Sequence, residues 1–166
     1  MSRAQASLPS GYLSLRNAGH GPQNGLGIFA RKTIPKSCRF GPAEGLEHRL
    51  NSIDDIIDDD ELNLVVITDD GSIIKLDVSD EEESNWMRFV RSAERYSEQN
   101  LIVTQDHGQL YFTSTRTINP RQELRVWYSP EYADSRGLGV LKPSPEDLGK
   151  LHSSVTYLDI WEKSFN

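Results

Sequence analysis

The sequence contains a single cysteine, Cys38, and no apolar run that approaches the ~20 residues needed for a membrane-spanning helix. One cysteine excludes an internal disulfide, and also any zinc module built from several cysteines, within these 166 residues. Basic residues are scarce as well, because 18 Lys and Arg stand against 25 Asp and Glu and give a formal net charge of -7. Since binding to a phosphate backbone depends on Lys and Arg, we do not expect this chain to bind nucleic acid by itself.

Short strand-like runs separated by turn residues dominate the sequence. A hairpin is predicted over residues 62–78, where two β-branched runs flank an Asp-Asp-Gly turn, and another over residues 101–115 around Asp-His-Gly. Residues 12–16, 26–30 and 124–128 have the pattern of further strands. The chain is long enough for one domain with a sizeable core. It is therefore predicted to form a β-rich α+β domain.

The composition of the chain differs between its ends and its middle. Residues 1–7 are small and polar, which favours a flexible lead-in, and residues 8–133 hold the strand-like runs. Residues 134–166 contain a linker rich in glycine and proline and a C-terminal helical segment. Within this segment, apolar residues recur on one helical face over 155–165, so we expect this face to pack back on the domain.

A few helices and one acidic loop are also expected. Ser79 or Asp80 is placed to cap a helix that runs through residue 90, and Ser144 to cap one that begins at Pro145. Residues 54–61 hold six acidic side chains, and such a density of like charge favours a solvated loop or a short surface helix.

Generic catalytic motifs are absent from the sequence, which has no P-loop, no HExxH and no GxSxG. Cys38 lacks a neighbouring base to activate it, and the dispersed histidines predict no metal site. The glycine pair near residue 26 and the tyrosine at residue 128 can each be interpreted in two ways. Gly25 and Gly27 either let a ligand approach the backbone closely or relax a tight strand entry. Tyr128, at a strand end, either directs its hydroxyl into a cleft or lies in the core.

The order of several motifs along the chain resembles a SET domain, the fold of most protein-lysine methyltransferases. The opening motif reads NGLGIFARKTIPK at residues 24–36, and the closing motif reads INPRQEL at 118–124 with Trp127 and Tyr128 behind it. Three further pieces are similar to the PR subfamily, found in the PRDM family of transcription regulators: FGP at 40–42, NWMRFV at 85–90 and EQNL at 98–101.

This resemblance covers residues 8–133, which are expected to form a PR/SET-like domain. It implies a SET-like fold of small, mostly antiparallel sheets with a C-terminal pseudoknot-like threading. It also implies a cofactor, S-adenosylmethionine, bound against Gly25, Leu26 and Gly27, with Tyr128 as the catalytic tyrosine that assists methyl transfer. The family's Asn-His pair aligns with Arg91 and Ser92. An arginine only donates hydrogen bonds and adds a positive charge, so the sequence departs from the family at the cofactor-binding pair.

Two functional hypotheses follow from the resemblance. In the first, which the departure at Arg91 and Ser92 favours, the chain is a PR domain with weak or absent methyltransferase activity. It then acts in the nucleus as a protein-interaction module of a transcription regulator, on a histone tail or another chromatin protein. In the alternative, it is an active S-adenosylmethionine-dependent histone-lysine N-methyltransferase. In both, DNA is contacted only through zinc fingers outside this segment, and no membrane or metal is involved.

Overall fold

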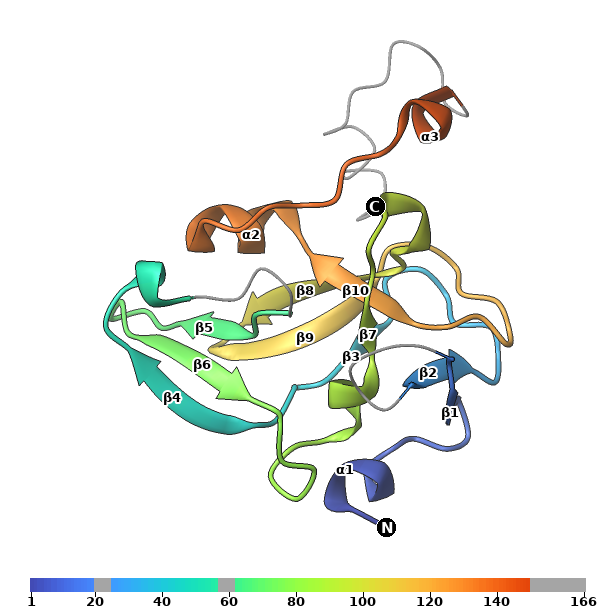
Figure 1. Ribbon diagram of the computed structural model, residues 1–166, viewed down its shortest axis with the longest axis horizontal. Helices are drawn as coiled ribbons and strands as arrows, with labels where there is room; N and C mark the ends of the chain where they lie inside the picture. Colours follow the sequence, from blue (N-terminus) through green and yellow to red (C-terminus); the bar gives the residue numbers. More distant parts are fainter. Residues whose placement is uncertain (20–24, 57–61, 150–166) are drawn as a thin grey trace.

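The computed structural model of the chain describes residues 1–19, 25–56 and 62–149, and its strands form three sheets. Figure 1 shows a three-stranded sheet on the left of the view, a two-stranded sheet on the right and a five-stranded sheet between them. Short helices and turns connect the strands. The predicted β-rich fold with few helices and several small sheets is confirmed.

The five-stranded sheet has the order β3-β9-β8-β10-β7. Its strands are β3 (Arg39–Phe40), β7 (Arg91–Ser92), β8 (Leu101–Asp106), β9 (Gln109–Ser114) and β10 (Arg125–Tyr128). β10 lies between β7 and β8 and runs parallel to both, although it follows both in the chain. This insertion of a late strand between two earlier ones corresponds to the threading that the sequence resemblance implies.

The hairpin predicted over residues 101–115 is confirmed as β8 and β9, which pair in register from Leu101 opposite Ser114 to Asp106 opposite Gln109. The two residues between them, His107 and Gly108, both have positive φ, 49° and 76°. Positive φ at both central residues defines the turn that matches the twist of the flanking strands. A glycine adopts this conformation without a steric penalty, so the local sequence sets the register.

The three-stranded sheet has the order β4-β6-β5, with β4 at Leu46–Leu50, β5 at Val65–Ile67 and β6 at Ile73–Asp77. Its β5–β6 hairpin confirms the prediction over residues 62–78. Strand β4 was not predicted, because four of its five residues are exposed and its sequence lacks alternation of apolar and polar side chains. The third sheet pairs β1 (Leu13–Asn17) with β2 (Leu26–Ala30).

A core of apolar side chains joins the sheets. β2 contributes Ile28, and the five-stranded sheet contributes Leu101, Val103, Phe112 and Val126, all completely buried. At the edge of β2, Glu123 forms an isolated bridge with Phe29, and the Leu124 N–H donates to the Ile28 carbonyl. The segment that precedes β10 is thereby fixed against β2. These contacts bring the opening and closing sequence motifs together.

The N-terminal segment differs from the flexible lead-in expected over residues 1–7. It contains α1 (Arg3–Ala6), which Ser2 and Gln5 cap reciprocally. Ala4 is completely buried, and its N–H donates to the carbonyl of Glu81 at 2.9 Å. Burial and capping together hold this short helix against the domain, which the polar composition of the segment did not indicate.

Two other local predictions differ from the structure. The helix expected from Ser79 or Asp80 to residue 90 is only the 3-10 turn η2 (Trp86–Phe89), because Asn85 caps it and the chain becomes extended at Val90. α2 (Pro130–Arg136) was not predicted, and it extends across the expected boundary at residue 133.

The predicted cap at Ser144 is confirmed, because its hydroxyl accepts from the N–H of Asp147 at the start of α3 (Pro145–Gly149). The 3-10 turn η1 (Ile53–Asp55) begins the acidic stretch. The rest of that stretch from residue 57, and the helical face predicted over 155–165, lie outside the described residues. No helix among the described residues is long and apolar enough to cross a membrane.

Candidate functional site

The glycines of the opening motif lie where β2 begins. Gly25 has a φ of +79°, which favours glycine, and Leu26 and Gly27 continue into β2. A Cβ atom added to Gly27 would lie 2.5 Å from Oε2 of Glu123, so any larger residue would displace that carboxylate. The missing side chain of Gly27 therefore makes room for Glu123.

The same carboxylate binds Arg91. The Nε of Arg91 donates to Oε2 of Glu123 at 2.6 Å, and Nη2 donates to Oε1 at 2.8 Å. Both side chains are largely buried, with exposed fractions of 17% for Arg91 and 14% for Glu123. This bidentate geometry is the strongest form of an ion pair between side chains. The hydrogen bonds to Glu123 raise the pKa of Arg91 further above its usual value, although burial opposes them, so the guanidinium stays charged.

Further charges extend this ion pair across the parallel strands. Nη2 of Arg125 lies 3.0 Å from Glu98, Nη1 lies 3.9 Å from Glu123, and the same guanidinium donates to the carbonyl of Ser92. Burial is the largest single effect on the pKa of Glu98 and raises it, but the hydrogen bond from Arg95, the charge of Arg125 and the hydrogen bond from the Glu94 N–H together bring it below its usual value. The carboxylates and guanidinium groups therefore compensate one another within the protein.

Tyr128 belongs to a different cluster. Its side chain is 1% exposed, and its hydroxyl accepts from the backbone N–H of Asn63 at 2.7 Å and from Nδ2 of Asn63 at 3.2 Å. Its ring stacks on Tyr132 with centroids 5.4 Å apart. The Tyr132 hydroxyl in turn accepts from the N–H of Val65, and burial raises the pKa of that hydroxyl. The hydroxyl of Tyr128 is thus held in the interior rather than presented to solvent.

One cleft, of about 560 Å³, reaches two of the predicted residues. Arg91 and Ser92 lie in its wall together with Asn63, whereas Gly25, Leu26, Gly27 and Tyr128 do not line it. The other lining residues come from β4, residues 62 and 64, β6 with the two residues after it, and η2 with Val90. The structure therefore connects Gly27 to Arg91 through Glu123 and places Tyr128 behind Asn63. Neither Glu123 nor Asn63 was assigned a role from the sequence.

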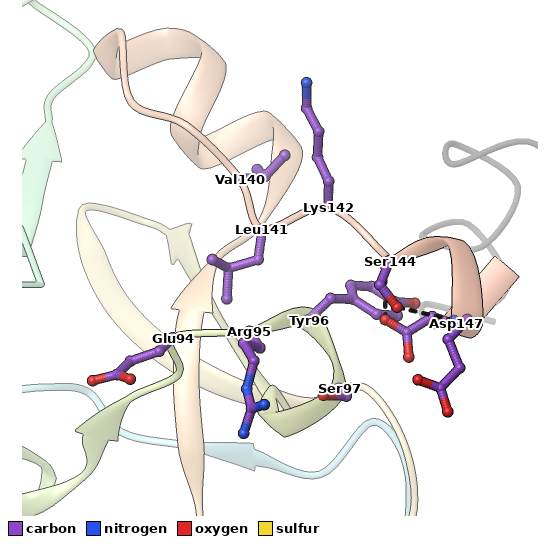
Figure 2. A pocket seen from close by; sticks show the side chains of 10 residues that line it. Glu94, Arg95, Tyr96, Ser97, Val140, Leu141, Lys142, Ser144 and Asp147 are labelled. Atoms are coloured by element: carbon purple, nitrogen blue, oxygen red, sulfur yellow. Dashed lines mark hydrogen bonds between the residues drawn. The ribbon is translucent and has the colours of Figure 1, made fainter.

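A second cleft, of about 580 Å³, lies between η3 (Tyr96–Glu98) and the segment that follows α2 (Figure 2). Figure 2 shows the ring of Tyr96 beside the hydrogen-bonded turn of Ser144 and Asp147, and Leu141 above η3. The sequence analysis did not predict this cleft, because η3 and α3 are far apart in the chain. Neither cleft contains a metal site, and no group of three metal-binding side chains occurs among the described residues.

Small sheets, with β10 inserted between β7 and β8 beside a glycine-containing strand, define a SET-like domain. Residues 14–139 match the family model of the PR domain of PR domain zinc finger protein 2. The chain therefore belongs to the PR domain family, as the sequence motifs predicted.

Two relatives and one solved structure agree with this assignment. PR domain zinc finger protein 10 of Danio rerio is 38% identical over 137 residues, which cover 81% of this chain and 12% of the relative. PR domain zinc finger protein 15 of Homo sapiens is 36% identical over 142 residues, which cover 86% of this chain and 12% of the relative. The solved methyltransferase domain of human PR domain-containing protein 2 has a TM-score of 0.63 at 26% identity, and the match covers 75% of this chain and 81% of that one. The chain thus spans about an eighth of the length of the two PR domain zinc finger proteins.

Proposed function

We propose that this chain is the PR domain of a nuclear transcription regulator and acts in chromatin as a protein-interaction module with weak or absent methyltransferase activity. The observation that carries the proposal is the buried ion pair of Arg91 and Glu123 beside Gly27. The relatives are zinc finger proteins, which supports DNA contact through zinc fingers outside this segment.

The residues present do not fit S-adenosylmethionine in the way that the sequence resemblance implies. The carboxylate of Glu123 fills the space that the absence of a side chain on Gly27 creates. The guanidinium of Arg91, which stands in place of an asparagine, uses its Nε and Nη2 on that carboxylate. A cofactor bound here would have to displace a charge-assisted, bidentate interaction that is largely shielded from water.

The second supporting observation is the environment of Tyr128. A tyrosine that orients an amine needs its hydroxyl in the reaction channel. Here Asn63 already donates two hydrogen bonds to that hydroxyl, and the ring is buried against Tyr132. These contacts give Tyr128 a role in connecting β10 to the segment that precedes β5.

The cleft of Figure 2 supports a basic protein segment as the partner. Glu94, Glu146 and Asp147 line it together with Tyr96. Figure 2 shows Asp147 on the side of the Tyr96 ring and Glu94 at the opposite end of the cleft. Of its two cations, Arg95 binds Glu98, and Lys142 points away from η3 in Figure 2. Carboxylates next to an aromatic ring attract Lys and Arg side chains, which are frequent in histone tails. The partner is therefore proposed to be a histone tail or another chromatin protein with a basic segment.

Calorimetric titration with S-adenosylmethionine tests the cofactor part of the proposal. We expect no saturable heat for the native chain. We expect measurable binding for Arg91→Asn, which removes the cation and supplies a group that both donates and accepts. Arg95→Asn is the matched control, because it removes the same charge from a side chain that is 78% exposed. Saturable binding to the native chain would overturn the cofactor part of the proposal and remove its main support for weak or absent methyltransferase activity.

Titration with histone-tail peptides tests the interaction part. We expect binding that weakens when Glu94→Lys and Glu146→Lys are introduced, and that is unaffected by Glu82→Lys, which lies on the exposed turn before η2. Equal loss of affinity for all three substitutions would indicate a general effect of net charge and would contradict the assignment of the cleft.

A further inference from the structure

The two edge strands of the three-stranded sheet, β5 and β4, differ in whether side chains bind their outward-facing backbone groups. On the β5 edge, side chains bind the backbone groups that point away from β6. The N–H of Val65 donates to Tyr132 Oη at 2.8 Å, and its carbonyl accepts from Arg136 Nε at 2.8 Å. The amide of Gln105 donates to the carbonyl of Ile67 and accepts from its N–H. These contacts leave no room for another strand beside β5.

On the β4 edge, no side chain of the described residues binds the outward-facing backbone groups in this way. β4 pairs with β6 alone among the strands that the structure describes, and four of its five residues are exposed. In Figure 1 it is the outermost strand on the left of the view. Leu46, with 42% exposure, is one of the few large apolar side chains that face solvent in the described part of the chain. An open strand edge of this kind is a template for pairing with another strand.

The sheet register shows which backbone groups face outward from β4. The N–H of Leu76 donates to the carbonyl of Leu64, so the backbone groups of Leu76 point toward β5. Successive residues of a strand point their backbone groups in opposite directions, so those of Lys75 face β4. His48 lies opposite Lys75 and uses its own groups there. The residues on either side of His48 therefore direct their N–H and C=O groups to the open edge.

Those two residues are Glu47 and Arg49, and the sequence of β4, LEHRL, is complementary to itself in the antiparallel direction. A second copy aligned on His48 places Glu47 opposite Arg49 twice, and Leu46 opposite Leu50 twice. We propose that β4 is a homodimerisation edge, where two copies of this chain pair antiparallel about a two-fold axis that passes His48. The proposal is independent of the proposed function.

The order of the charged residues along β4 favours a second copy of this chain as the partner strand. Charged side chains on an edge strand usually prevent pairing, because identical charges meet when two copies approach. In β4, Glu47 and Arg49 lie on opposite sides of His48, so each charge lies opposite a charge of the other sign in the second copy. Each Glu47–Arg49 pair also exchanges two backbone hydrogen bonds. The pairing joins the two three-stranded sheets into one continuous sheet. A strand of five residues buries far less than the ~1,600 Å² of a standard interface, so the dimer is weak and dependent on concentration.

Sedimentation equilibrium over a concentration series tests the pairing. We expect the average mass to rise from the 18.8 kDa of one chain toward twice that value. Glu47→Arg places arginine opposite arginine and should keep the chain monomeric, and Arg49→Glu should do the same with glutamates. The double variant with Glu47→Arg and Arg49→Glu has complementary charges again and should restore the dimer. Glu82→Arg, which makes the same charge change on another exposed turn, should leave it unchanged.

Disulfide trapping tests the register. A pair of residues whose backbone groups face away from the shared edge lies with Cα atoms about 4.5 Å apart, which suits a disulfide. In a Cys38→Ser background, His48→Cys should therefore form a linked dimer on oxidation. Leu46→Cys should not, because each copy of residue 46 lies opposite residue 50. A single mass at every concentration, a dimer that survives Glu47→Arg, or linkage at 46 as readily as at 48 would overturn the proposal.

Discussion

Replacing Glu123 by glutamine isolates the contribution of the buried ion pair. The pair of Arg91 and Glu123 has exposed fractions of 17% and 14%, whereas the pair of Arg3 and Glu44 has 52% and 46%, and in both pairs the charged atoms are less than 3 Å apart. Breaking a fully buried pair costs ~3–5 kcal/mol, and an exposed pair contributes ~0–1 kcal/mol. Since some water reaches the inner pair, we expect Glu123→Gln to lower the free energy of unfolding by about 2–3 kcal/mol.

Urea unfolding measures this difference, and Glu44→Gln is the control. We expect Glu44→Gln to lower the free energy of unfolding by less than about 1 kcal/mol. Adding Arg91→Gln completes a double-mutant cycle, in which we expect a coupling energy of at least about 1 kcal/mol between Arg91 and Glu123. If Glu123→Gln cost no more than Glu44→Gln, the burial argument would be refuted, and with it the main support for the proposal that the ion pair of Arg91 and Glu123 stands in the way of a cofactor.

Three further predictions concern the same region. Gly27→Ala should destabilise the chain by about 1–3 kcal/mol in urea unfolding, because its Cβ would lie 2.5 Å from Oε2 of Glu123. Tyr128→Phe should cost about 1–2 kcal/mol in the same assay, because two buried donors of Asn63 lose their acceptor. The pKa of Glu98 is lowered in the folded chain, so its contribution to stability is present above the unfolded pKa of about 4.3 and is lost as the pH falls through the folded pKa. Glu98→Gln should therefore flatten the fall of the urea midpoint below about pH 4.5.

Each of these predictions has a control and a result that would contradict it. Gly11→Ala meets no atom within 4 Å, so it should change stability by less than about 0.5 kcal/mol, and an equal loss at Gly27 and Gly11 would argue against the clash. The control for Tyr128→Phe is Tyr12→Phe, which alters a tyrosine that is 58% exposed and should leave the free energy of unfolding unchanged. For Glu98, an acid-induced decrease as steep as in the native chain would show that the network with Arg95 and Arg125 adds nothing.

The sequence predicted a strand or helix where the residues that determine it lie within the element itself. The β8–β9 hairpin was predictable because Asp106, His107 and Gly108 carry the turn chemistry themselves. α2 was also signalled, since Ser129 caps it, Pro130 opens it and a left-handed glycine ends it, but a Gly/Pro-rich composition obscured these residues. β4 had no local signal at all. Its exposed side chains do not alternate, so only its partner β6 identifies it as a strand.

The candidate site was predictable only as separate positions. The sequence motifs singled out Gly27, Arg91 and Tyr128, and each lies in an ordered element. Their partners could not be deduced, because Glu123 is 32 residues from Arg91, and Asn63 is 65 residues from Tyr128. Contacts over such separations depend on the threading of β10 between β7 and β8, which no local pattern specifies.

Gly27, Arg91 and Glu123 form one structural unit, and this explains why the departure from the family motif is tolerated. An arginine introduced alone at a largely buried position would lack a counter-charge, and its desolvation would be costly. Glu123 supplies that counter-charge from the closing motif, and Gly27 leaves the space that the carboxylate needs. In Arg91→Asn, Arg125 remains 3.9 Å from Glu123, so the carboxylate keeps a cation. That variant should therefore disturb the unit less than Glu123→Gln does, which makes it the suitable variant for the cofactor titration.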